Sequence, residues 1–137
     1  MSRLELSDTV VKRLFALSGN QCAYPGCEQM LIDLDGSLIG EICHIEAASS
    51  KGQRFNNNST DDERRSFENL ILLCSNHHKK TNNVKIYSPE KLRQFKLEHM
   101  NMFKNKKIEV PSTIIQKAIK MQMQQTNTNT GSGTQII

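Results

Sequence analysis

Apolar positions near the start of the chain recur at intervals of three and four residues, and this spacing predicts a helix over residues 8–18. Ser7 can cap the first turn of that helix, and Gly19 suits the position after its last turn. The apolar face of the expected helix is formed by Val10, Val11, Leu14 and Phe15.

Short apolar runs bounded by polar turns come next, and they predict strands rather than helices. Residues 30–32 and 38–45 are the first two runs, and an Asp-Leu-Asp-Gly turn at 33–36 joins them. The polar stretch over residues 46–59 is expected to form a long loop. Residues 70–73 are a third apolar run and predict another short strand.

Four further helices are expected in the second half of the chain. The first follows a capping box that begins at Thr60, and the third follows a Ser88-Pro89 start signal. The expected ranges are 61–67, 77–83, 89–105 and 113–124. The apolar residues of the last two helices are Leu92, Phe95, Phe103, Ile114, Ile115, Ala118 and Ile119.

These elements predict an α+β protein with one small domain over residues 1–107 and a helix with a low-complexity tail over residues 108–137. The chain has 137 residues and a mass of 15.6 kDa, and 36% of its residues are hydrophobic. Such a chain buries only a thin core, so we expect a metal ion or a partner chain to add stability. No apolar run is long enough to form a membrane span or a signal peptide, so a cytoplasmic location is expected.

Basic charge is concentrated in one part of the chain. Residues 1–78 carry a net charge of −4, whereas residues 79–107 carry +7 and residues 108–137 carry +1. A lysine run of this kind is either a solvated helix face or a surface that binds phosphates. The neighbouring residues decide between these two interpretations.

Four cysteines and four histidines supply the most informative pattern. Cys22 and Cys27 enclose a Pro-Gly turn in a C-x4-C knuckle, and Cys74 with His77 forms a C-x2-H half-site of matching size. In a reducing compartment metal ligation is a better interpretation than disulfide pairing. The four residues predict a closed, tetrahedral Zn²⁺ site with a structural role. The alternative is two buried free cysteines and an exposed histidine.

A second set of polar residues follows the predicted strands. His44 ends an apolar strand, Asn69 precedes the next strand, and His78 lies at the start of a helix beside the expected zinc ligand His77. This order resembles the HNH nucleases, which have a ββα-metal fold. The resemblance spans about residues 14–100 and is greatest to the HNH effector nucleases of bacterial anti-phage systems, through the Cys-His-Ile strand end, the stretch over residues 61–74 and the His-His pair.

The resemblance implies a role for each of these residues. His44 would be the general base that takes a proton from water, and His78 would bind a single catalytic Mg²⁺ or Mn²⁺ ion. Asn69 would orient the loop that carries the base or would bind the metal through its side-chain oxygen. Asn69 could also be only a cap at the entry of the strand.

Two positions depart from the pattern of the family. Cys43 stands where many HNH motifs have an Asp or His that binds the metal, and a thiolate is a poor ligand for Mg²⁺. Cys43 is therefore either a ligand for a softer ion or a packed strand residue. Asn82 stands where relatives often carry Asp, and it is a weaker candidate ligand for the catalytic ion.

The resemblance implies an HNH endonuclease that hydrolyses the phosphodiester bonds of DNA as a defence effector, and we expect its sequence specificity to be low. The alternatives are a zinc-stabilised module that binds nucleic acid without cleaving it and a structural or adaptor protein. Basic residues around the expected site would contact phosphates without reading bases. They are Arg54, Arg64, Arg65, Lys79, Lys80 and Lys85, followed by Lys91, Arg93 and Lys96 on the next helix, where His99 is expected at the surface.

The apolar stripe of the last predicted helix suggests an assembly. A lone helix does not keep such a stripe exposed, so residues 108–124 are expected to form a homo-oligomer, most simply a dimer. A nuclease of low specificity also requires control, which a separate regulatory partner could supply. The final residues, rich in Asn, Thr and Gln, are expected to be disordered or to associate as stacked strands.

Overall fold

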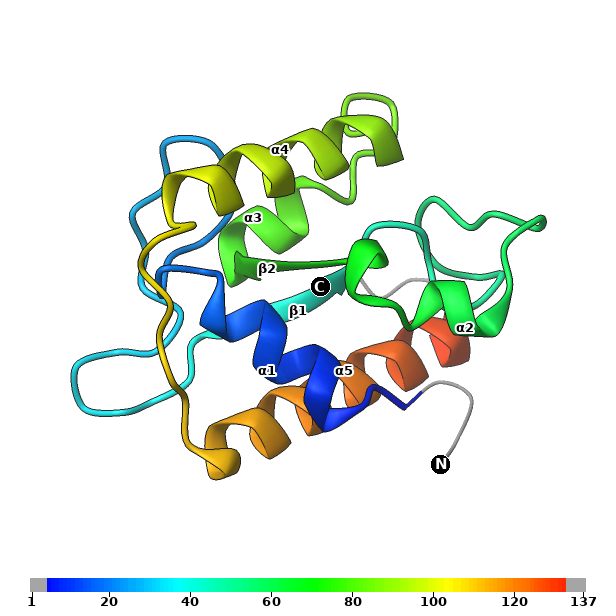
Figure 1. The fold of residues 1–137 in the computed structure, drawn as a ribbon. Helices are drawn as coiled ribbons and strands as arrows, with labels where there is room; N and C mark the ends of the chain where they lie inside the picture. Colours follow the sequence, from blue (N-terminus) through cyan, green and yellow to red (C-terminus); the bar gives the residue numbers. More distant parts are fainter. Residues whose placement is uncertain (1–4, 133–137) are drawn as a thin grey trace.

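A computed structural model describes residues 5–132, and residues 1–4 and 133–137 lie outside the description. Two strands and several helices confirm the predicted α+β class (Figure 1). The elements in chain order are α1 Asp8–Ala16, β1 Gly40–His44, α2 Asp61–Arg64, the 3-10 helix η1 Phe67–Asn69, β2 Leu70–Cys74, α3 Ser75–Lys80, α4 Pro89–Met102 and α5 Ser112–Ser132.

The two strands form an antiparallel pair between two helical layers. Gly40 pairs with Cys74 at one end of the sheet, and His44 pairs with Leu70 at the other end. Leu70 and Leu72 pack into a core with α1 and α5, whereas the alternate residues of β2 pack with residues of α4 and the cysteine knuckle. Figure 1 shows the strands between α1 and α5 on one side and α3 and α4 on the other. Because β2 is buried on both faces, its sequence is a continuous run of apolar residues instead of an alternating pattern.

The first predicted helix is confirmed at its start, whereas it ends at Ala16, two residues before the predicted end at residue 18. The Ser7 hydroxyl accepts a hydrogen bond from the backbone N–H of Val10, as an N-cap does. Gly19 follows the helix with φ of +63°, and a Cβ at this position would lie 2.3 Å from the ring of Phe103. Glycine is therefore required here both by backbone conformation and by close packing.

Several predicted boundaries were wrong. The two runs over residues 30–32 and 38–45 do not form the two predicted strands. Only Gly40–His44 forms a strand, β1, while Met30 pairs with Gln21 and Ile32 pairs with Leu38 in isolated bridges. The helix expected over residues 61–67 ends at Arg64, although its capping box forms as predicted. Helix α3 begins at Ser75, two residues before the expected start.

The last helix differs most from its prediction. Helix α5 continues to Ser132, beyond the predicted end at residue 124, so the expected low-complexity tail is helical as far as the structure describes it. Ile115, Ala118 and Ile119 are buried against α1 and β1. The apolar stripe that suggested a dimer is thus covered within the chain, and the oligomeric state stays a prediction. Among the described residues, no helix is both long enough and apolar enough to span a membrane.

Candidate functional site

The cysteine knuckle is built by a tight turn. Gly26 has a φ of +79°, and the N–H of Cys27 donates to the carbonyl of Tyr24 within the turn. The N–H of Ala23 donates to the carbonyl of Leu72, which joins the knuckle to β2. Since Cys74 ends the same strand, the two half-sites meet at one end of the sheet.

The four predicted ligands come together with distances that suit a metal ion. The ligand atoms of Cys22, Cys27, Cys74 and His77 all lie within 4.8 Å of one another. Nδ1 of His77 is 3.6 Å from Sγ of Cys22 and 3.3 Å from Sγ of Cys74. A tetrahedral zinc ion separates a sulfur ligand and a nitrogen ligand by roughly 3.5 Å. The cluster could therefore hold zinc.

The groups around this cluster determine the protonation of Cys22 and the orientation of the His77 ring. Burial raises the pKa of the Cys22 thiol to about 12, so a positive charge is needed to stabilise its thiolate. The His77 ring is stacked on Tyr24 at a centroid distance of 3.9 Å, with the planes 3° apart. The Tyr24 hydroxyl contacts the hydroxyl of Tyr87 at 2.7 Å. This stack fixes the orientation of the His77 ring toward the sulfur atoms.

Two residues of the second predicted set, His44 and His78, border a small cavity at the side of the sheet, and the third, Asn69, does not line it. His44, His78 and Asn82 all line this cavity, whose volume is about 60 Å³. His44 is the last residue of β1, and His78 lies on α3. Burial, together with the neighbouring His78, lowers the pKa of His44 to about 4. The imidazole of His44 is therefore neutral at pH 7, which is the form that can accept a proton.

His78 has two close partners that the sequence analysis did not assign to it. Its Nδ1 lies 2.5 Å from a carboxylate oxygen of Glu41, and the side chain of Cys43 is in hydrogen-bonding contact with its ring. Attraction to Cys43 and these hydrogen bonds outweigh burial and raise the pKa of His78 to about 10. A carboxylate on one ring nitrogen is typical of histidines that bind metals through the other. A metal ion at His78 would replace its proton.

Asn69 is wholly engaged with the backbone. Its side-chain oxygen accepts from the N–H of Glu46, and its amide nitrogen donates to the carbonyls of Glu46 and Arg64. All three distances lie between 2.8 and 2.9 Å, and the residue is buried. Of the two roles that the resemblance implied for Asn69, this geometry supports orientation of the loop after His44 rather than metal binding.

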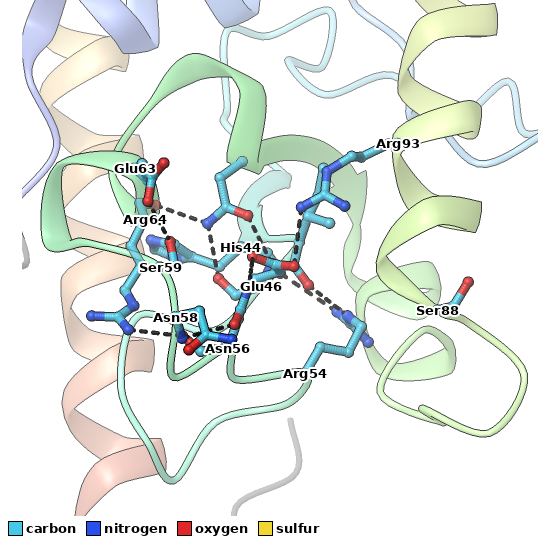
Figure 2. Close-up of polar contacts among 12 residues, drawn as sticks. His44, Glu46, Arg54, Asn56, Asn58, Ser59, Glu63, Arg64, Ser88 and Arg93 are labelled. Atoms are coloured by element: carbon cyan, nitrogen blue, oxygen red, sulfur yellow. Dashed lines mark hydrogen bonds and ion pairs between the residues drawn. The ribbon is translucent and has the colours of Figure 1, made fainter.

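Glu46 connects that loop to a distant helix. Figure 2 shows the Glu46 carboxylate between Arg93 of α4 and Asn56 of the following loop. The distance to Arg93 is 3.2 Å and the distance to Asn56 is 3.3 Å. Arg93 is thus partly committed to an ion pair, although its side chain is 43% exposed.

Arg54 reaches into the chain instead of toward solvent. Its guanidinium donates to the carbonyl of Ile45 at 2.6 Å, to that of Thr81 at 2.6 Å and to that of His44 at 3.4 Å. Arg54 also has a φ of +60°, a backbone conformation that is strained for a residue with a side chain. It therefore holds the end of β1 against the end of α3, which are the elements that carry His44 and His78. Figure 2 shows the Arg54 side chain directed toward the chain near His44.

The other basic residues fall into three groups, which are ion-paired arginines, one buried lysine and exposed lysines. Arg64 and Arg65 form ion pairs with Asp61 and Asp62 on their own short helix. The prediction that Lys96 lies on the outer surface was wrong. Lys96 is buried, and its ammonium group donates to the carbonyl of Phe67 and contacts the ring of the same residue. Lys79, Lys80 and Lys85 remain exposed, and the ammonium group of Lys80 lies 5.1 Å from the ring centroid of Tyr24, beside the cysteine knuckle.

His99 was also wrongly expected at the surface. It is buried, and its Nε2 lies 2.7 Å from the carbonyl oxygen of Ser18. Its ring packs 4.9 Å from that of Phe103. This histidine joins α4 to the loop after α1 and lies apart from the cavity.

Gln122 lines the cavity and contacts His44, although it was not among the predicted site residues. It comes from α5, is 2% exposed, and its side-chain nitrogen lies 3.1 Å from Nδ1 of His44. Its position on the same face as the apolar residues of α5 is a weak signal, because a polar residue at such a position is usually solvated. Glu41 was missed as well, although its place three residues before His44 puts it on the same strand.

A sequence-family model described as HNH endonuclease matches residues 16–83, just under half of the chain. The matched segment holds the knuckle, both strands and α3, and the match supports the HNH family for this segment. The expected ββα-metal arrangement is thus confirmed at the level of the fold. No curated protein matches the chain.

Proposed function

We propose that this protein is a metal-dependent endonuclease that hydrolyses phosphodiester bonds of DNA. The observation that carries the proposal is the shared cavity of His44 and His78 within a segment that matches the HNH family. A divalent ion such as Mg²⁺ or Mn²⁺ at His78 supplies positive charge to the scissile phosphate and to the departing oxygen.

The residues of the chain perform the proton transfer. His44 accepts a proton from a water molecule, and the oxygen of that water forms a bond to phosphorus. The bond from phosphorus to one ester oxygen breaks, and the departing oxygen takes a proton from solvent. Glu41 holds the ring of His78 in place, while Asn69 and Arg54 hold the backbone directly after His44.

Zinc at Cys22, Cys27, Cys74 and His77 has a structural role in this proposal. A closed site with four protein ligands leaves no position for water or substrate, so it stabilises the fold rather than the reaction. It fixes the start of α3, and His78 is the next residue after the ligand His77. The zinc site therefore sets the position of the catalytic ligand.

The exposed lysines and the low aromatic content support binding through phosphates with low sequence specificity. Lys79 and Lys80 lie at the end of α3, Lys85 lies in the segment that follows it, and all three are exposed. The role of a cytoplasmic anti-phage effector rests on the resemblance alone. Control by a separate partner and a dimer through residues 108–124 remain part of the same proposal.

The test is digestion of supercoiled plasmid with Mg²⁺ or Mn²⁺, with and without EDTA. The proposal expects nicked and linear products that require the divalent ion, and loss of both products in His78→Ala. Binding without cleavage under all conditions would favour the zinc-stabilised binding module. Matched single-stranded DNA and RNA substrates would define the nucleic acid that is cleaved.

A further inference from the structure

Helix α5 closes over the base. It packs on β1 and α1 through Ile115, Ala118 and Ile119, and this packing brings Gln122 to the cavity. The helix begins at Ser112, well beyond the segment that matches the family. The cover over His44 is therefore a feature of this chain outside the matched HNH segment.

Both ring nitrogens of His44 are withdrawn from water. Nδ1 lies 3.1 Å from the amide nitrogen of Gln122. Nε2 is buried and has no hydrogen-bond partner within the described part of the chain. A general base must lie within hydrogen-bonding distance of the water that it deprotonates. In this conformation neither nitrogen meets that condition.

The conclusion holds for either orientation of the Gln122 amide. If the amide nitrogen donates to Nδ1, the neutral ring carries its proton on Nε2 and has no lone pair left for water. If the amide oxygen instead accepts from Nδ1–H, the remaining lone pair lies on Nε2, which solvent does not reach. His44 is unable to take up a proton from bulk water in both cases.

We propose that Gln122 and the second half of α5 hold the site in a closed resting state, and that the base becomes active only when Gln122 leaves His44. The inference rests on the proposed function, because it assigns a control step to the same site. The apolar residues earlier in α5 belong to the core, so the movement involves the helix from about Gln122 onward and leaves Ile115 in place.

The test measures access to His44 independently of catalysis. Diethyl pyrocarbonate modifies neutral imidazoles that solvent reaches, and the tryptic peptide over residues 14–51 contains His44 as its sole histidine. Gln122→Ala removes the contact, and Gln122→Met removes the hydrogen bond while keeping a side chain of similar size. Gln116→Ala is the matched control, because Gln116 is an exposed residue of α5 that bonds Asp8.

Loss of one ordinary hydrogen bond shifts an opening equilibrium by about fivefold. We therefore expect both Gln122 variants to raise the rate of His44 modification, and of plasmid nicking, by about fivefold, with no change in Gln116→Ala. An unchanged modification rate in folded Gln122→Met overturns the inference. Faster modification with slower nicking also overturns it, because Gln122 would then position the base instead of blocking it.

The two proposals fail in different ways. If no variant nicks DNA under any condition, the proposed nuclease function fails. The rates of His44 modification still decide whether Gln122 closes the cavity. Thermal unfolding of each variant shows whether a faster modification reflects a local opening or loss of the fold.

Discussion

Arg54 provides a sharp test of how the site is held together. The sequence predicted a phosphate contact, whereas the structure has the guanidinium bound to three backbone carbonyls at the ends of β1 and α3. Arg54→Lys keeps the positive charge but cannot bind three carbonyls with a planar fork. The substitution therefore separates a structural clamp from a simple charge.

The size of the effect follows from the contacts. The two bonds at 2.6 Å are charge-assisted and contribute about 1.5–3 kcal/mol each, while the third, at 3.4 Å, adds little. Lysine can retain part of one bond, so we expect Arg54→Lys to lower the free energy of unfolding by about 2–4 kcal/mol. For a chain of this size the loss corresponds to a fall in Tm of roughly 10 °C.

Thermal unfolding and DNA binding are measured on the same preparations. Lys79→Ala is the control, since Lys79 is exposed on α3. Lys79→Ala should leave the free energy of unfolding within about 0.5 kcal/mol of the wild-type value. It should also lower the slope of DNA affinity against salt concentration by the equivalent of about one phosphate contact. The structural role of Arg54 is refuted if Arg54→Lys has the Tm of the wild type and Arg54→Ala weakens DNA binding as much as Lys79→Ala does.

Three further outcomes are expected. Elemental analysis should find one Zn²⁺ per wild-type chain and none in Cys27→Ser. The Tm of Cys27→Ser should also be lower, because metal binding contributes to folding. Zinc-free wild-type protein with an unchanged Tm would contradict this prediction. Burial lowers the pKa of Lys96 to about 8 from about 10.5 when unfolded, so the unfolded chain binds more protons between these values. Wild-type stability should therefore rise by about 2 kcal/mol from pH 7 to pH 10, and Lys96→Met should lack this rise in urea titrations. Asn69→Ala removes three buried hydrogen bonds and should cost about 2–4 kcal/mol by the same assay, whereas a loss below 1 kcal/mol would show that the contacts are weak.

The zinc cluster and the order of the site residues could be predicted because their signals are local. Each half-site lies within six residues, and a Pro-Gly turn or a helix start brings its two ligands together without reference to the rest of the chain. His44 and Asn69 were found for the same reason, since each lies at the end of an apolar strand. Local patterns of this kind remain valid in any fold that contains them.

The contacts that complete the cavity could not be predicted, because they join distant parts of the chain. Gln122 is 78 residues from His44, and Arg54 reaches Thr81 across 27 residues. Lys96 was misplaced because its chemistry suggests a surface, while the ring of Phe67 and a backbone carbonyl accept its ammonium group in the interior. Such burial depends on tertiary packing rather than on spacing.

The packing of α5 shows the same limit in a helix. The apolar face of α5 was recognised from the sequence, but the spacing of its residues does not indicate whether that face packs within the chain or against a second chain. The stripe packs on α1 and β1 of the same chain, and the helix then continues through a polar segment that has little propensity for order. Once the first turns are held by packing, each further residue adds a hydrogen bond without a new nucleation step, and this explains the length of the helix.

The central claim is that His44 is the base of a metal-dependent nuclease, and plasmid cleavage by His44→Ala tests it most directly. The variant is first shown to keep the Tm and the zinc content of the wild type, since His44 lies outside the zinc cluster. With Mg²⁺ or Mn²⁺ present, the account predicts that nicking falls by about 10²-fold or more, the usual contribution of a general base. Undiminished nicking by a folded, zinc-loaded His44→Ala protein would contradict the account.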